Sequence, residues 1–554
     1  MRSKSKNNFK SKPKLKPKPK YHPKPHSRSK QKQKQKPKIK KIKISKETTI
    51  REQIDENTLL HQQRVIQHML THRGLVVAHG MGSGKTRISI LLVLLLKIPA
   101  IVVVPASLQE NYKKEIDKVK NKIKGVDESL FTVISSTSFL TKIPDCKGKI
   151  LIVDEAHELR NEQGKISQSV LSCAIGAQKV LLMTGTPLVN KPGDIAPLLN
   201  MIVKDHINVK IQQTNNTNEK MTTYLFKEIP TGILFSEMFG ESGVNDLGMK
   251  LWKQILPCTF SYYVPPKSDD FPDKKVIDVM VPMTQKQEQF YRAWESRTLT
   301  PQMVKILSKT TSKSTNTEAL QDKMEKMSQF KAYLDGGKRI CNVVKINNEW
   351  YAPKFEIMVK HLVEHHQNQN QQQKQQYKTV IFSQFLDMGI DIAAHMLLER
   401  GIKFVRFTGQ ETQVQKKLAV DDYNLGRTKV FLISSAGGLG LDLKNTDFMH
   451  IMEPAWNLAK IDQVEGRVVR FKSSDKPGAV VTIFKYYCYK PNNNNNNIIT
   501  NLFRSNTKQI TLSADMYLKM ISEKKHIVNT NFFKHIVPLS IENSPVGSCT
   551  EDQL

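Results

Sequence analysis

A glycine-rich run near residue 80 has the residue types and spacing of a phosphate-binding turn. It consists of Gly80, Met81, Gly82, Ser83, Gly84, Lys85 and Thr86, with apolar runs on both sides. Glycines let the backbone turn its N–H groups onto a phosphate, and a helix beginning here would add the positive end of its dipole. Lys85 would reach the terminal phosphates of a nucleotide, and the Thr86 hydroxyl would hold Mg²⁺. His79 stands where the strict pattern has glycine, so the sequence predicts a variant P-loop.

Two adjacent carboxylates, Asp154 and Glu155, directly follow the apolar run 150–153. Such a run is typical of a buried strand, and a parallel α/β sheet places its ligands at the carboxyl ends of its strands. Asp154 would hold Mg²⁺ through water, and Glu155 would orient and deprotonate the water that attacks the phosphate. In isolation, a solvated acidic strand end explains the pair equally well. With a P-loop upstream, the pair predicts nucleotide hydrolysis.

Six further segments stand in the order expected of a superfamily 2 helicase-type motor, and the chain resembles that family. Residues 59–70 resemble the family's adenine-sensing segment, with Gln62 as the adenine reader. The other five resemble motifs Ia, III, IV, V and VI, at residues 101–108, 184–190, 380–385, 434–443 and 463–470. Each segment alone is a weak signal, but their joint order is specific.

The variants of these motifs resemble the Swi/Snf-type double-stranded DNA translocases. They are Thr-Gly-Thr-Pro at 184–187, Ala-Gly-Gly at 436–438 and Pro-Ala-Trp-Asn at 454–457. The tetrad Asp-Glu-Ala-His at 154–157 is shared with the DEAH-box RNA helicases. Those enzymes, however, carry Ser-Ala-Thr in motif III and Gln-Arg-x-Gly-Arg in motif VI, and this chain has neither. Within the branch, the chain most resembles viral members of the poxvirus and giant-virus type, which include nucleoside triphosphatase I and the small subunit of the early transcription factor.

This resemblance implies an α/β fold of two tandem RecA-like parallel-sheet domains, with ATP and Mg²⁺ in the cleft between them. By the pattern of motif VI, Arg467 and Arg470 would stabilise charge on the transferring phosphoryl group, and Gln463 would support them. Without the surrounding motif, two arginines three residues apart would more often be a solvated helix face. The candidates for nucleic-acid contact or for coupling to the ATP site are Ser107, His157, Thr186, Ser435, Gly437 and Trp456. For Trp456 and His157, a purely structural role in the core remains an alternative.

The first 50 residues form a basic tail that cannot bury a core. They contain 18 Lys, 2 Arg and a single Glu, a net charge of +19 out of +34 for the chain. Lys, Pro, Gln and Ser dominate, so we expect disorder. A lysine run attracts phosphate backbones without reading sequence. A solubilising segment, the product of an AT-rich genome and a nuclear-import address are alternatives that charge alone does not separate.

Six cysteines are scattered along the chain without a Cys-x-x-Cys pair. This predicts a reduced, intracellular protein without a structural zinc site. The N-terminus has no apolar stretch of the signal-peptide type, and the apolar window 88–104 is broken by Lys97 and Pro99. That window predicts a buried helix followed by a strand, and no membrane partner is expected. A viral chain would act in the viral factory or virion, and any other in the nucleus.

The motifs predict five regions and an active enzyme. The expected regions are the tail 1–50, a RecA-like domain 51–270 with an insertion at 205–245, a helical connector 271–352, a second RecA-like domain 353–490, and a helical extension 491–554. Runs rich in Gln or Asn at 366–376 and 492–497 are expected to be surface insertions. The predicted function is an ATP hydrolase that moves on or remodels double-stranded DNA, serving viral transcription beside a viral RNA polymerase or transcription complex. An ATP-dependent RNA helicase, and a DNA-binding transcription-factor subunit with secondary ATPase activity, are the alternatives.

Overall fold

The structure is a computed structural model of the 554-residue chain. It describes residues 52, 54, 56, 58–123, 126–203, 207–215, 218–239, 244–266, 271–301, 303, 328–367, 377–435, 441–470, 472–476, 478–491, 512–544 and 549. The basic tail, the asparagine run 492–497 and most of the run 366–376 therefore lie outside the described residues. The helices and strands given below belong to a compact unit that covers residues 49–554.

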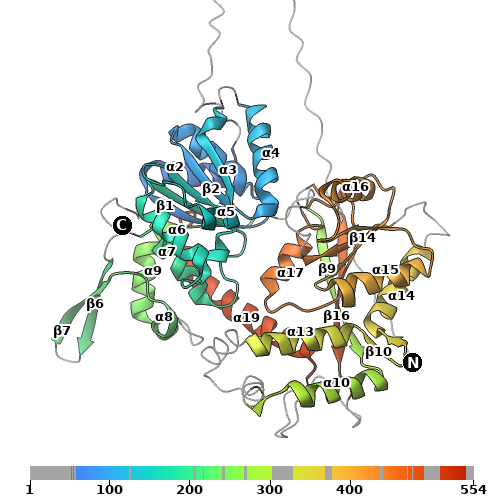
Figure 1. The fold of residues 1–554 in the computed structure, drawn as a ribbon. Helices are drawn as coiled ribbons and strands as arrows, with labels where there is room; N and C mark the ends of the chain where they lie inside the picture. Colours follow the sequence, from blue (N-terminus) through green and yellow to red (C-terminus); the bar gives the residue numbers. More distant parts are fainter. Residues whose placement is uncertain are drawn as a thin grey trace, which may run out of the picture. The chain divides into compact units, whose positions relative to one another are not determined.

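The first domain is built on a six-stranded parallel sheet with the strand order β3-β2-β4-β5-β1-β8. The strands are β1 (Gly74–His79), β2 (Ala100–Val104), β3 (Phe131–Ser135), β4 (Ile150–Val153), β5 (Lys179–Thr184) and β8 (Phe260–Tyr263). The helices are α2 (Leu60–Thr71), α3 (Lys85–Leu96), α4 (Gln109–Lys120), α5 (Ser136–Thr141), α6 (Lys165–Gly176), α7 (Ala196–Asn200), α8 (Gly232–Phe239) and α9 (Asp246–Thr259). Side chains of α2, α3 and α4 form one core cluster with the sheet, and those of α5 to α9 form the other. Figure 1 shows these helices packed around the strands.

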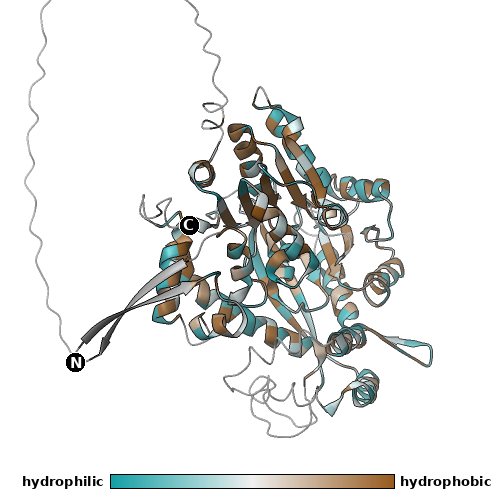
Figure 2. Ribbon diagram, turned by 60° about the vertical axis from the view of Figure 1, so that its left-hand side comes forward, coloured by the Kyte–Doolittle hydropathy of each residue, from teal (hydrophilic) through white to brown (hydrophobic). Residues whose placement is uncertain are grey.

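The second domain repeats this plan with the strand order β13-β14-β12-β15-β16-β9, again parallel throughout. Its strands are β9 (Asp273–Pro282), β12 (Thr379–Ser383), β13 (Phe404–Phe407), β14 (Val430–Ser434), β15 (Phe448–Ile451) and β16 (Val480–Tyr489). Helices α14 (Pro353–Gln367) and α15 (Asp391–Leu398) cover one face, and α16 (Gln413–Asn424) and α17 (Leu458–Glu465) cover the other. Apolar residues are concentrated in the central strands of both sheets, because helices bury them on both sides (Figure 2). The predicted fold class, two parallel-sheet α/β domains, is confirmed.

Strand β9 is an element that the sequence analysis did not predict. It lies in the segment 271–352, which was expected to be a helical connector, yet it pairs with β16 along ten residues at the edge of the second sheet. Its sequence, Asp-Lys-Lys-Val-Ile-Asp-Val-Met-Val-Pro, carries the β-branched residues that favour strands. The second sheet therefore draws one of its strands from outside the predicted domain.

The remaining elements form a helical connector and two hairpins. The connector contains α10 (Gln285–Thr298) and α13 (Ser328–Asn342), whose Trp294 and Tyr333 rings stack 5.1 Å apart. A short hairpin of β10 (Val344–Ile346) and β11 (Glu349–Tyr351) follows it. The predicted insertion at 205–245 contains a second antiparallel hairpin, β6 (Ile207–Asn215) with β7 (Asn218–Phe226).

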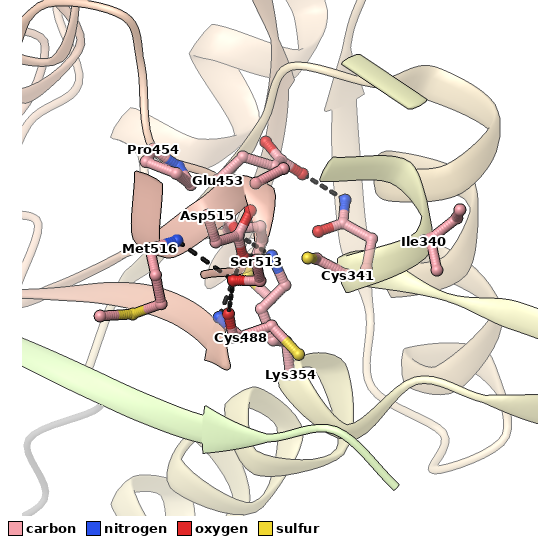
Figure 3. A network of polar contacts seen from close by, with 12 residues as sticks. Ile340, Cys341, Lys354, Glu453, Pro454, Cys488, Ser513, Asp515 and Met516 are labelled. Carbon is pink, nitrogen blue, oxygen red and sulfur yellow. Dashed lines mark hydrogen bonds and ion pairs between the residues drawn. The ribbon is translucent and has the colours of Figure 1, made fainter. Parts of the chain in front are cut away.

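The last long helix, α19 (Ala514–Ile536), joins the cores of the two domains. Near its start, the Asp515 carboxylate accepts a hydrogen bond from the Lys354 ammonium of the second domain at 2.8 Å, and both side chains are fully buried (Figure 3). Near its end, Phe532 and Ile536 belong to the core of the first domain. The helix therefore packs against both domains.

Lys354→Met is expected to lower the free energy of unfolding by about 3–5 kcal/mol, because it leaves the Asp515 carboxylate buried without its counter-charge. The double variant Lys354→Met/Asp515→Leu should recover part of this loss, since it buries neither charge. Urea denaturation followed by circular dichroism measures both. A single variant as stable as the wild type would show that the pair does not hold α19.

The cysteines correct one expectation from the sequence. The structure joins Cys146 to Cys173 and Cys258 to Cys549 by disulfides, whereas the sequence analysis expected only free thiols. The sequence separations of 27 and 291 residues form no motif, so only the fold reveals the pairs. Cys341 and Cys488 remain free and buried. Among the helices of the described ranges, none has the length and apolar character needed to cross a membrane.

Candidate nucleotide site

The glycine-rich run connects β1 to α3 as a tight turn. Gly82 and Gly84 have φ of 77° and 81°, in the left-handed region that residues with a Cβ rarely adopt. Helix α3 begins directly afterwards at Lys85, so its first backbone N–H groups have no intrahelical partner. The Lys85 ammonium donates to the carbonyl oxygens of His79 at 2.7 Å and of Gly80 at 3.2 Å. The turn thus leaves backbone donors, a helix dipole and an ammonium group available to an anion.

The carboxylates of Asp154 and Glu155 follow β4, and their surroundings move their pKa values apart. Burial raises the pKa of Asp154 to about 6, the charge of Glu155 adds to the effect, and Lys85 opposes it. Burial also acts to raise the pKa of Glu155. A hydrogen bond and charge from His157, together with the charges of Lys85 and Arg467, outweigh burial and hold that pKa below its usual value. Two neighbouring carboxylates separated in this way can take different roles at one pH.

His157 connects these carboxylates to segments of both domains. Its Nδ1 lies 3.1 Å from the Glu155 carboxylate and 3.2 Å from the Thr184 hydroxyl. Its Nε2 lies 3.5 Å from Nε2 of Gln463, in α17 of the second domain. The Thr184 hydroxyl accepts a hydrogen bond from the backbone N–H of Thr186 at 3.0 Å. The structure therefore brings His157, Thr186 and Gln463 together beside Glu155.

The two arginines of motif VI bring positive charge to the same place. Burial lowers the pKa of Arg467 to about 10, Arg470 adds to this, and Glu155 opposes it. Burial also lowers the pKa of Lys85, an effect that both carboxylates oppose and Arg470 reinforces. The lysine and Glu155 of the first domain and the arginines of the second thus lie within electrostatic range of one another. Three cations gathered around two acids leave an excess of positive charge for an anionic ligand.

The P-loop and motif VI also touch directly. A Cβ added to Gly466 would lie 2.1 Å from the terminal carbon of Met81, so only glycine allows this approach while Met81 keeps its position. Three nearby polar groups are buried and have no hydrogen-bond partner among the described residues: the hydroxyls of Ser83 and Thr186 and Nε of Arg467. Buried polar groups are normally satisfied, so each of these can bond to a ligand. A triphosphate with Mg²⁺, rich in acceptor oxygens, fits this set.

Gln62 packs α2 against the P-loop. Its Oε1 accepts a hydrogen bond from the backbone N–H of Leu59 at 3.1 Å, and its Nε2 donates to the Ser83 carbonyl at 3.0 Å. His61 contacts the same carbonyl at 2.9 Å and stacks on Tyr263, with ring centroids 3.7 Å apart. Sequence reasoning missed this stacked pair. His61 stands beside Gln62 in the sequence, but only the fold brings Tyr263 of β8 to it.

Two cavities are lined by residues of both domains. The first, of 530 Å³, is lined by residues that include His157, Ser435, Lys460, Gln463 and Arg467. The second, of 710 Å³, is lined by residues that include Arg160, Lys191, Lys331, Lys338, Trp456 and Lys460. Burial lowers the pKa of Lys460, and the nearby charge of Lys338 adds to that effect. The second cavity is therefore rich in cations and has an aromatic ring in its wall.

Three candidates from the sequence remain, and they differ in where they stand. Ser107 is exposed in the short helical turn Ala106–Leu108 after β2 and lines neither cavity. Gly437 falls outside the described residues. Trp456 lines the larger cavity and also packs against the apolar cluster of the connector and α19, so that both of its expected roles fit its position.

Comparisons with known proteins agree with this arrangement. An SNF2-related domain matches residues 126–346, and a helicase conserved C-terminal domain matches residues 353–472. Two Acanthamoeba polyphaga mimivirus proteins, both named as ATP-dependent RNA helicases, are 29% and 23% identical to the chain. The first alignment covers 87% of this chain and 97% of the relative, and the second covers 76% and 79%. The ISWI chromatin-remodeling complex ATPase of Saccharomyces cerevisiae is 24% identical over 69% of this chain and 34% of its own length. The two domain matches and these relatives together show that the chain is similar to the helicase-family ATPases of the SNF2 type.

Proposed function

We propose that the chain hydrolyses ATP and uses the released energy to move along, or to remodel, double-stranded DNA. The observation that carries this proposal is the meeting of charged groups from two domains. Lys85, Asp154 and Glu155 come from the first domain, and Arg467 and Arg470 come from the second. A site divided in this way changes whenever the domains move, so that hydrolysis and domain movement become coupled.

In the first domain, the proposed roles follow from charge and protonation. The Lys85 ammonium has three N–H donors, so it can bind phosphate oxygens of ATP while the His79 carbonyl keeps it in place. Glu155, whose pKa is below its usual value, is ionised at neutral pH and takes the proton of the attacking water. Mg²⁺ held by Thr86 and Asp154 would neutralise charge on the phosphates.

In the second domain, Arg467 and Arg470 stabilise the charge that develops on the transferring phosphoryl group. Nε of Arg467 is buried without a partner among the described residues, which supports a donor role toward a ligand. Gln463 supports this machinery through its contact with His157, which in turn contacts Glu155. Gln463, His157 and Glu155 thus form a chain of contacts that links motif VI to the carboxylate proposed to activate the water.

The larger cavity is the proposed nucleic-acid side of the cleft. Its lysines and Arg160 suit a phosphate backbone, which is bound by charge and without reading of sequence. The SNF2-type domain match and the motif variants favour double-stranded DNA as the substrate. The mimivirus relatives and the motif resemblance to viral members support a role in viral transcription, inside the host cell, beside a viral RNA polymerase or transcription complex.

RNA is the second candidate substrate, because both mimivirus relatives are named as RNA helicases. A triplex-displacement assay distinguishes translocation from strand separation. In it, a motor that moves along a DNA duplex releases a third strand without separating the two strands of the duplex. We expect ATP-dependent release of the third strand and no separation of an RNA duplex. Separation of the RNA duplex without triplex displacement would contradict the DNA assignment.

Lys460→Ala is expected to raise the DNA concentration for half-maximal ATPase stimulation by roughly tenfold and to lower the salt slope of DNA binding by about one, because one phosphate contact is lost. Titration of DNA at several salt concentrations measures both quantities. Lys429→Ala, a lysine in the second domain that lines neither cavity, is the matched control. An unchanged salt slope for Lys460→Ala would remove this residue from the proposed DNA contact.

A further inference from the structure

His79, the residue that replaces glycine at the start of the P-loop, has contacts on both its backbone and its side chain. It is the last residue of β1, and its side chain is fully buried. Its backbone carbonyl accepts the hydrogen bond from Lys85 at 2.7 Å. Its Nε2 lies 2.6 Å from the Ser261 hydroxyl and 3.7 Å from the Glu542 carboxylate. A single residue therefore joins the P-loop lysine to a polar cluster.

Glu542 enters this cluster from the segment that follows α19, at the far end of the chain. Its carboxylate accepts hydrogen bonds from the backbone N–H of Tyr262, at 2.8 Å, and from the Ser261 hydroxyl. The preceding residue, Ile541, donates its backbone N–H to the Phe260 carbonyl at 2.9 Å. The segment thus lies along β8, the strand that pairs with β1.

Two more contacts fix this segment on the first domain. Arg64 of α2 donates to the backbone carbonyl of Glu542 at 2.9 Å. Seven residues further on, Cys549 is joined to Cys258 of α9 by a disulfide. Contacts before and after Glu542 in the sequence therefore hold it against the first domain.

We propose that Glu542 is a positioning residue of the P-loop: together with Ser261 it fixes the His79 imidazole, and thereby the backbone carbonyl that holds Lys85. This inference rests on the proposed ATP site. It assigns to the C-terminal segment a part in nucleotide binding, and it explains how the chain functions with a histidine where the strict P-loop has glycine.

The polarity of the hydrogen bonds supports the proposal. Nδ1 of His79 has no hydrogen-bond partner among the described residues, so the ring is held by the polar contacts of Nε2 and by edge-on packing against the rings of His61 and Tyr263. Burial lowers the pKa of His79, which is therefore neutral at pH 7 and can donate from Nε2. Burial would raise the pKa of Glu542, but the nearby His79 and hydrogen bonds from Ser261 and the Tyr262 backbone outweigh it and keep the group ionised. The order is then His79 N–H to the Ser261 oxygen, and Ser261 O–H to the carboxylate.

The Glu542→Gln variant tests this order, because a carboxamide accepts at only one of its two terminal atoms. Either the Tyr262 N–H or the Ser261 O–H then loses its acceptor, and the order of hydrogen bonds that orients the ring is disturbed. We expect the Kd for a non-hydrolysable ATP analogue, measured by calorimetry on the full chain, to rise about tenfold. The KM for ATP should rise by the same factor, and kcat should change by less than about twofold. The control is Glu523→Gln, which removes an exposed carboxylate of α19 paired with Lys519.

A double variant separates positioning from general stabilisation. In a His79→Gly background, Glu542→Gln should no longer raise the Kd, because the ring on which it acts is absent. An equal loss in both backgrounds, accompanied by a lower melting temperature, would show a structural role and overturn the proposal. So would a Kd for Glu542→Gln equal to that of the wild type. A wild type that binds the analogue but hydrolyses no ATP would contradict the proposed function alone.

Discussion

Arg470→Ala and Arg467→Ala are each expected to lower kcat for ATP hydrolysis by about 10³- to 10⁵-fold, the effect of losing an arginine that stabilises phosphoryl-transfer charge. Their effect on the Kd for an ATP analogue should be far smaller, since the charge that they stabilise develops in the transition state. Single-turnover hydrolysis measures the first quantity, and calorimetry measures the second. The electrostatic effects of Arg470 on Lys85 and of Glu155 on Arg467 are the structural basis of this expectation.

Two further variants control for charge and geometry. Arg427→Ala removes an exposed arginine of the second domain that pairs with Asp422, and it should leave kcat unchanged. Arg467→Lys keeps the charge but not the forked geometry, and it should restore little activity. If Arg467→Ala and Arg470→Ala both kept kcat within tenfold of the wild type, motif VI would not act on the transferring phosphoryl group.

Glu155→Gln is expected to lower kcat by about 10²- to 10⁴-fold, the usual contribution of a general base. The amide cannot accept a proton, yet it has nearly the same shape, so binding of ATP should persist. The measurement is steady-state hydrolysis combined with calorimetric binding of the analogue. A variant that binds and does not hydrolyse would also be useful for trapping the chain on DNA.

Glu128→Gln, at an exposed carboxylate of the first domain that pairs with Lys120, is the matched control for charge removal. It should retain full activity. Retention of more than a tenth of the wild-type kcat by Glu155→Gln would show that another group activates the water.

Local sequence patterns predict the sheets well, because both are buried on two faces. Continuous apolar runs such as 75–78 and 150–153 are stable only when both faces of the strand are buried. The first run precedes the P-loop, and the second precedes the pair Asp154–Glu155. Strand β9 escaped prediction because its partner, β16, lies about two hundred residues further along the chain, beyond the reach of local pattern. The helices α10 and α13 follow β9 in the same segment, so the segment as a whole has the composition of a helical region.

The sequence predicts those parts of the candidate site that lie in one contiguous motif. It does not predict contacts between residues that only the fold brings together. The P-loop and the pair Asp154–Glu155 carry their own signals. The stack of His61 on Tyr263 and the contact of Glu542 with the residues around His79 join segments far apart in the sequence. The two disulfides are hidden for the same reason. The sequence shows that a histidine replaces the P-loop glycine, but it gives no sign that Glu542 lies beside this histidine.

The most direct test of the account is ATP hydrolysis by the purified chain, alone and with double-stranded DNA, single-stranded DNA or RNA. Lys85→Ala is the blank, because it removes the ammonium that would bind the phosphates. The account predicts strong stimulation by double-stranded DNA that disappears in Lys85→Ala. Stimulation by RNA alone, or no hydrolysis with any of the three, would contradict it.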